Sequence, residues 1–367
     1  MKYYLVTILF AIVCFSNLYS QAYSEQGLEP SDSLKDSEYP YLLPIYGAEA
    51  YKLGYKLPYS AGIGVNYLWQ NSDLVIDNLQ IGFNNGPLYS LDELIRFNDA
   101  QSTASAINVR PDIWLFPFLN VYGIFAQAKT STEINAGLWL PDTSNNWNEI
   151  SAFSTKADFD ATTLGIGITP TFAIKGWWLA LDMNFAWTDV SALDKPVFTY
   201  VFGPRMGKTY KFSDDMNIAF WFGAFRVKFS SATSGNLNLN ELFDGNDLQS
   251  KVDQGLIRVD EAQTEVDTWW NSLSPLEQQK PVNQAKYETA NRTIQTAGNF
   301  LNNVDGAISN IENSTVQYSL DKTNKNYWNF IIGTQFQLNK HWQIRAEYGF
   351  LGSRNQFLGG LQYRFGL

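Results

Sequence analysis

Apolar and polar residues alternate with a period of two along most of the chain. The clearest case is residues 177–188, where one face is wholly apolar and carries a tryptophan at each end. Successive side chains of a strand point to opposite faces, so this pattern predicts a strand with a different environment on each side. An apolar face about ten residues long, closed by aromatic rings, is typical of a strand that crosses a bilayer.

Alternation between turn residues predicts eleven strands in all, at 59–70, 74–83, 104–115, 119–129, 158–172, 177–188, 197–207, 216–229, 328–338, 342–350 and 357–367. Closed single-chain bacterial barrels have an even number of strands, so a twelfth is needed. Residues 46–56 or residues 132–140 could supply it. We favour the first, which places the turn at 116–118 in the periplasm, because the second would make the long connection 84–103 periplasmic.

The segment 230–324 has a different period. Apolar residues follow steps of three and four from Tyr287 to Ile311, and a similar series from Val252 to Leu273 has one polar gap at Gln263. This spacing predicts two helices, at 247–273 and 283–312, that pair as an antiparallel coiled-coil hairpin. Short turns are periplasmic and long loops extracellular in such barrels, so we expect the insert outside the cell.

The composition supports a barrel. Aromatic residues make up 16% of the chain and charged residues only 17%, and no run of about 20 apolar residues follows the N-terminus. The fold class expected is therefore all-β and transmembrane, a 12-stranded antiparallel outer-membrane β-barrel formed by 46–229 and 325–367, with the α-helical hairpin inserted.

The N-terminus has the pattern of an export signal. Lys2 precedes an apolar stretch and a small residue at Ser20, which predicts a signal peptide at 1–20 and an exposed lead-in at 21–45. Cys14 could instead carry a lipoprotein's lipid, although Val13 before it is not the small residue such a site needs. If the peptide is removed, the mature chain has no cysteine, which excludes disulfides and thiolate chemistry. The localisation expected is the outer membrane.

Charge is concentrated in the insert. Its 13 acidic and 6 basic residues give -7 of the formal net charge of -10. Nucleic acid is excluded as a partner, because phosphate binding needs a basic stripe and the chain has none.

Three segments carry a resemblance to a known family: RPDIWLFPFLNVYG at 110–123, TWWNSL at 268–273, and residues 328–367. They resemble an uncharacterised family of Gram-negative outer-membrane β-barrel proteins with a helical insert before the last three strands. The resemblance covers most of the mature chain, and its last forty residues are the most specific. It implies the fold and the location, and it brings no established activity.

Catalytic residues are scarce. His341 is the chain's one histidine and lies in an expected periplasmic turn, where a surface residue is more typical than a general base. Carboxylates of the acidic loops could hold Ca²⁺ weakly, but a solvated surface explains them better. We therefore expect no enzyme activity, no bound metal and no cofactor.

Seven charged residues are expected to face the lumen: Asp182, Arg205, Arg226, Lys228, Arg345, Glu347 and Arg364. They could form a constriction that selects solutes, with anions favoured. Pairs of arginine and carboxylate could equally plug the lumen. The sequence does not decide between the two.

Two functions follow from these patterns. The first is a narrow, porin-like solute channel with a charged lumen. The alternative is a surface interaction or assembly protein that binds an extracellular protein through the hairpin. Trp269 and Trp270 lie near the turn of the hairpin and are the candidate contacts, with Trp270 in the seam and Trp269 more available. The expected partners are outer-membrane lipid, a small solute and this extracellular protein.

Overall fold

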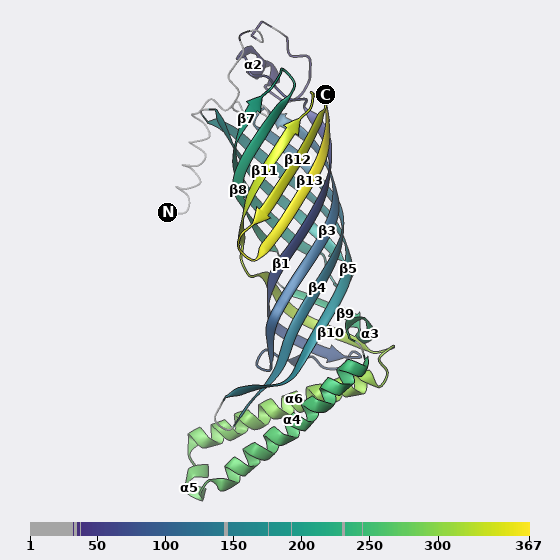
Figure 1. Ribbon diagram of the computed structural model, residues 1–367, viewed down its shortest axis with the longest axis vertical. Helices are drawn as coiled ribbons and strands as arrows, with labels where there is room; N and C mark the ends of the chain where they lie inside the picture. The colour runs from purple at the N-terminus through teal and green to yellow at the C-terminus, as the bar shows by residue number, and fades with distance from the viewer. Residues whose placement is uncertain are drawn as a thin grey trace.

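Antiparallel strands make up most of the molecule in the computed structural model (Figure 1). The structure describes residues 32, 35, 36, 38–142, 146–174, 176–191, 193–229, 232–243 and 245–367. The signal peptide predicted at 1–20, with Cys14, lies outside the described residues, as does most of the lead-in predicted at 21–45.

Ten strands close into a barrel, because β1 pairs with β13 from Ala61↔Phe365 to Ser72↔Arg354. The barrel strands are β1 (Ala61–Phe83), β3 (Ile95–Phe116), β4 (Leu119–Pro141), β5 (Trp147–Ile174), β6 (Trp177–Val190), β7 (Val197–Lys211), β8 (Asn217–Phe229), β11 (Trp328–Gln337), β12 (Trp342–Phe350) and β13 (Arg354–Phe365). Closure leaves no free strand edge at this level of the barrel.

The outer face of this closed part carries an exposed apolar belt. Ile166, Phe222 and Phe330 are each more than half exposed there. Aromatic side chains border the belt at both ends, with Trp177 and Trp342 towards the C-terminal end and Trp187 and Trp328 at the other end. Alternation places these residues outside, and their neighbours in sequence therefore point into the barrel.

Four strands, β1, β3, β4 and β5, continue beyond the belt on the side away from the C-terminus. There β10 (Thr315–Asn324) pairs with β1 from Leu74↔Asn324 to Phe83↔Val316, in the place that β13 leaves. Next to β10 lies β9 (Ala232–Asn238), and the short β2 (Tyr89–Ser90) also pairs with β1. The extension is a curved wall that runs from β9 to β5.

Two long helices cross the end of this wall (Figure 1). They are α4 (Gly245–Ser272) and α6 (Pro281–Ile308), joined through α5 (Pro275–Gln278), and α3 (Leu239–Leu242) links β9 to α4. Buried residues of both helices, such as Val252 and Leu301, share one apolar cluster with Leu138 of β4. The base of the helix pair is thus packed on the strands. In the described part of the chain, no helix has the length and apolarity to cross a membrane.

The prediction of twelve strands is wrong, because 59–70 and 74–83 form the single strand β1. Asn71, Ser72 and Asp73, a sequence typical of turns, stay extended and pair with β3. The backbone supplies these ladder bonds, and Ser72 binds Arg354, so the polar side chains do not break the strand. The helices occur where they were expected, although nothing establishes supercoiling.

Neither candidate for the twelfth strand is a separate strand. Residues 46–56 contain the helix α2 (Gly47–Lys52), and 132–140 are the upper part of β4. The turn at 116–118 nevertheless lies at the end of the barrel that holds the C-terminus, as expected. Residues 46–56 are not a strand and two other predicted strands are one, so the number of strands before the turn falls by two. A change by an even number leaves the direction of the later strands unchanged. The insert 230–324 also contains two strands, β9 and β10, that the sequence analysis did not predict.

Candidate functional site

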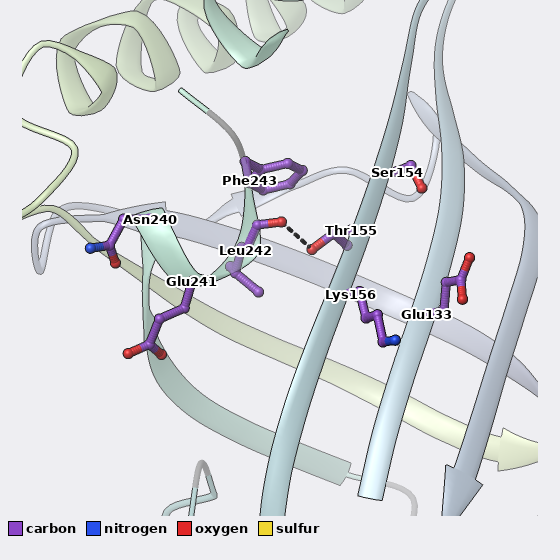
Figure 2. Close-up of a pocket in the computed structure, with 8 residues that line it drawn as sticks. All are labelled: Glu133, Ser154, Thr155, Lys156, Asn240, Glu241, Leu242 and Phe243. Atoms are coloured by element: carbon purple, nitrogen blue, oxygen red, sulfur yellow. Dashed lines mark hydrogen bonds between the residues drawn. The ribbon is translucent and has the colours of Figure 1, made fainter. Parts of the chain in front are cut away.

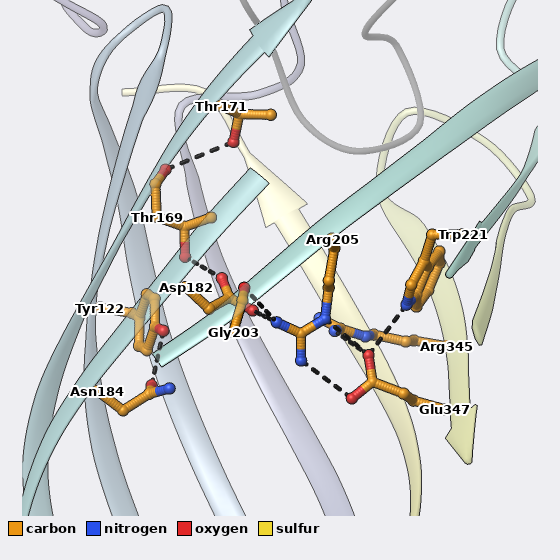
Figure 3. A network of polar contacts seen from close by, with 10 residues as sticks. All are labelled: Tyr122, Thr169, Thr171, Asp182, Asn184, Gly203, Arg205, Trp221, Arg345 and Glu347. Carbon is orange, nitrogen blue, oxygen red and sulfur yellow. Dashed lines mark hydrogen bonds and ion pairs between the residues drawn. The ribbon is translucent and has the colours of Figure 1, made fainter. Parts of the chain in front are cut away.

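Inside the belt, Arg205 of β7 bridges two carboxylates across the lumen (Figure 3). Its Nε and Nη2 donate to Glu347 of β12 at 2.8 and 3.0 Å, which is a bidentate contact. Its Nη1 also donates to Asp182 of β6. Bidentate, charge-assisted contacts fix direction as well as distance, so this arginine ties three strands together.

Further contacts complete this network. Trp221 Nε1 donates to Glu347 at 3.0 Å, and Arg345 donates to the same carboxylate at 3.2 Å. The exposed fractions of Asp182, Arg205 and Glu347 are 5%, 8% and 3%. The strands and side chains around this network therefore cover its charged groups almost completely.

Glycines make room for the aromatic side chains of this layer. A Cβ on Gly333 would lie 2.2 Å from the ring of Trp221, and one on Gly207 would lie 2.3 Å from the ring of Trp178. Real side chains do not approach so closely, so both rings rest directly on the backbone of a neighbouring strand. The two rings have centroids 6.0 Å apart and occupy the lumen beside the ion pairs.

Arg364 lines the lumen separately from this network, nearer the C-terminus. Its Nη2 lies 3.1 Å from Asp112, and its Nε and Nη2 donate to the carbonyl of Tyr59. The structure therefore brings together Asp182, Arg205, Arg345 and Glu347 among the predicted lumen residues, and places Arg364 in a second pair.

Arg226 and Lys228 do not face the lumen, and that part of the prediction is corrected. They alternate with Trp221 and Phe225, which point inward, and they share the exposed outer face with Phe222. The Arg226 guanidinium lies 5.6 Å from the ring of Tyr327, at the border of the belt. Their phase with Phe222 was visible in the sequence and should have indicated an outward position.

The two tryptophans of the hairpin lie at the end of α4 near α5. Trp270 stacks on Tyr287 of α6 with ring centroids 4.4 Å apart, and Trp269 lies 4.7 Å from the ammonium of Lys286. Among the described residues, no three His, Cys, Asp or Glu side chains are arranged to hold a metal.

A cavity of about 480 Å³ occupies the extension, between the lumen network and the helices. Inward side chains of the strands form most of its wall, and nearly all of them are apolar above the belt. They include Leu74, Ile76, Ile81, Phe83, Ile95, Phe97, Ile134, Ala136, Phe153, Phe159, Val316 and Leu320. The volume lies in the range of pockets that hold small-molecule ligands.

Helices close the top of the cavity. Leu248 of α4 and Phe300 and Val304 of α6 line it, together with Leu239 and Leu242 of α3. Ser151 of β5 donates to the carbonyl of Lys251 at 3.3 Å, which attaches the base of α4 to the wall. The helix pair is therefore a roof over the cavity and lies outside the lumen.

The side of the cavity between β5 and α3 has a second hollow of about 440 Å³ on its outer surface (Figure 2). In the described residues, β6 pairs with β5 only from Ala161 onward, so the upper part of β5 is a strand edge. Thr155 on this edge donates to the carbonyl of Leu242 at 3.0 Å. Thr155, Leu242 and Phe243 line both the cavity and the outer hollow. They are the thin partition between the cavity and the outside.

Polar side chains gather at the floor of the cavity, nearest the belt. Lys322 and Asn324 of β10 point inward there, with Ser72 of β1 and Thr132 of β4. Burial lowers the pKa of the Lys322 ammonium, since an apolar surrounding disfavours the charged form. Lys322 was not predicted as a site residue, because it lies in the segment 230–324, for which the sequence predicts a helical insert and no strand. It is nevertheless in phase with Val316 and Leu320.

Comparisons with known proteins add little. No family model matches the chain, and no curated protein matches it. An outer membrane channel from Pseudomonas putida F1 is 10% identical with a TM-score of 0.27, over 84% of this chain and 96% of that one. The translocator domain of autotransporter NalP from Neisseria meningitidis is 9% identical with a TM-score of 0.31, over 83% and 89%.

A FadL homologue from Pseudomonas aeruginosa is 8% identical with a TM-score of 0.28, over 95% of this chain and 97% of that one. Likenesses at this level carry no argument about function. The family resemblance seen in the sequence therefore stays a prediction.

Proposed function

We propose that the protein is an outer-membrane β-barrel that binds a small apolar molecule in the cavity of its outer half. The observation that carries this proposal is the cavity itself, about 480 Å³ in volume with a mostly apolar wall and a helical roof. A cavity of this size with such a wall would give an apolar ligand contacts on every side.

The exposed belt supports the membrane part of the proposal. Residues such as Ile166 and Phe222 would expose a continuous apolar surface to water, and a lipid bilayer removes that cost. The short turn at 116–118 and the C-terminus lie at one end, and the 84–94, 191–196 and 230–327 connections at the other. Short turns are periplasmic in such barrels, so the cavity and helices belong outside the cell.

The filled lumen favours binding over free permeation. A porin-like channel needs a continuous aqueous path, and the buried contacts of Glu347 with Arg205 and Trp221 join side chains of β7, β8 and β12 inside the barrel. The narrow channel expected from the sequence is the second candidate, favoured by the charged lumen side chains, and it requires this network to separate. Stepwise conductance of the unmodified protein in a planar bilayer would support it.

A surface role for the hairpin is compatible with a binding barrel. Only the base of the helix pair covers the cavity, and its α5 end projects past the wall (Figure 1). If Trp269 contacts a partner, Trp269→Ala should leave the melting of the purified protein unchanged while lowering surface binding. Trp270→Ala should instead destabilise the hairpin, because Trp270 stacks on Tyr287.

Binding of tritiated dodecanol to the protein in nanodiscs tests the proposal. Ala157 lines the cavity, and an indole there would fill much of the space, so Ala157→Trp should weaken saturable binding at least tenfold. Thr162→Trp is the matched control, because Thr162 lies on the same strand with an exposed, outward side chain. Absence of saturable binding by the parent protein, after subtraction of protein-free nanodiscs, would overturn the proposal.

A further inference from the structure

Among the residues that line the cavity, Lys322 is the one that carries a charge. Lys322 lies opposite Ile76 on β1, and its side chain lines the cavity. In the part of the chain that the structure describes, no carboxylate pairs with it and no hydrogen bond satisfies it. A buried charge without a partner is costly, so an anionic ligand in the cavity would stabilise this ammonium.

Nearby carboxylates point elsewhere. Asp321, the neighbour of Lys322 on β10, accepts a hydrogen bond from Asn78 on the other face of the wall. Asp194 of the β6–β7 loop accepts from Ser234, an exposed residue of β9. Neither acid therefore serves as the counter-ion of Lys322.

Two other polar groups of the cavity lining lack partners. The side-chain Nδ2 of Asn324 is buried and unbonded among the described residues, and so is the hydroxyl of Thr132. Asn324 is the next inward residue after Lys322 on β10 and lies nearer the belt. The floor thus combines a cation with free donors, whereas the space above it is apolar up to Phe300 and Val304.

We infer that the ligand of this cavity is a single-chain amphiphile with a carboxylate head, held by Lys322 at the floor with its alkyl chain directed towards the helical roof. This inference rests on the proposed function and names its ligand class. One ammonium with nearby amide and hydroxyl donors matches the single charge of a carboxylate. A phosphate head usually recruits an arginine fork. Arg354 donates its Nε to Ser72 at the floor, but it is not among the residues that line the cavity, so Lys322 is the charged group that meets the head.

The ammonium keeps its proton when such a ligand binds, because the carboxylate supplies the counter-charge that none of the described residues provides. Contacts between charged partners contribute about tenfold to hundredfold in affinity when water is excluded. The alkyl chain adds affinity in proportion to the apolar surface that it removes from water. Head and chain are thus recognised at opposite ends of one cavity.

Competition between dodecanoate and dodecanol for the same site tests the inference. Both molecules have the same chain, so their affinity ratio isolates the head group. In nanodiscs we expect the parent protein to prefer dodecanoate, and Lys322→Met to reduce that preference at least tenfold. Dodecanol binding should stay within about threefold of the parent value, since Met keeps the apolar length of the side chain.

Lys228→Met is the matched control, because Lys228 faces outward and should not affect the ratio. Dodecyl phosphate is the third ligand in this test. If it binds more tightly than dodecanoate, the inferred carboxylate head is wrong and the ligand has a phosphate head. An equal preference in the parent and Lys322→Met proteins would overturn the role of Lys322. Failure of all three ligands to bind the parent would instead overturn the proposed function.

Discussion

Glu347→Gln tests the closed lumen, because it removes one charge from the network and changes the side-chain shape very little. Glu347 accepts two hydrogen bonds from Arg205, at 2.8 and 3.0 Å, and one from Trp221 at 3.0 Å. The amide oxygen of glutamine can keep one of these donors, whereas its NH₂ group would face a guanidinium. Arg205 would then retain one carboxylate partner, Asp182.

The expected loss is large because both partners are buried. The side chains of Arg205 and Glu347 are 10% and 2% exposed, so solvent does not screen their pairing. Removing one partner of a buried ion pair costs about 3–5 kcal/mol in the free energy of unfolding. Guanidinium unfolding in lipid vesicles, followed by tryptophan fluorescence and by heat-modified mobility on gels, measures this loss.

Glu133→Gln is the matched control. Glu133 is exposed on the outer face of β4, so its replacement should change the free energy of unfolding by less than about 0.5 kcal/mol. A loss below about 1 kcal/mol for Glu347→Gln would refute the buried network. Combining Glu347→Gln with Arg205→Met should lose less than the sum of the single changes, with a coupling of about 1 kcal/mol or more.

Three further predictions concern the lumen, its glycines and the roof. The unmodified protein should show no stepwise conductance in a planar bilayer, whereas Trp221→Ala should introduce it by opening a gap beside Arg205. Gly333→Ala should lose about 1–3 kcal/mol of stability because its Cβ meets the ring of Trp221, while Gly306→Ala, in open space on α6, should gain about 0.5–1 kcal/mol. Replacing residues 262–291 by a short Gly-Ser linker should leave dodecanol affinity within about threefold, and Phe300→Asp should lower it at least tenfold.

Alternation was a strong guide where a strand contacts lipid. Residues 177–188 and 342–350 have a continuous apolar face, since the bilayer demands one, and both form strands close to the predicted bounds. Beyond the membrane this demand ends. Polar residues such as Asn71 and Asp73 continue the strand there through backbone pairing with β3, and Asn71 also donates its side-chain amide to Thr103. The number of strands was therefore overestimated.

The cavity was beyond the reach of the sequence for a different reason. Its wall joins β1 to β10, residues more than 200 positions apart, and its roof comes from helices that also pair with each other. A heptad pattern shows that apolar faces will be buried, but not whether strands share in that burial. The charged residues of the lumen were easier to predict from the sequence, because Arg205, Arg345 and Glu347 alternate with lipid-facing residues. Arg226 was wrongly predicted to face the lumen, although it lies on the same face of β8 as Phe222. The most apolar positions of a strand are therefore the ones that identify its lipid-facing side.

A crystal structure of the protein with dodecanoate that carries a terminal bromine tests the central claim most directly. Anomalous scattering from bromine locates the end of the chain without reference to any other atom. We expect one bromine peak inside the cavity, near Phe300 and Val304, with the carboxylate at Lys322. Bromine found only along the outer belt, beside residues such as Phe222, would show that the cavity is not a ligand site and would contradict the proposed function.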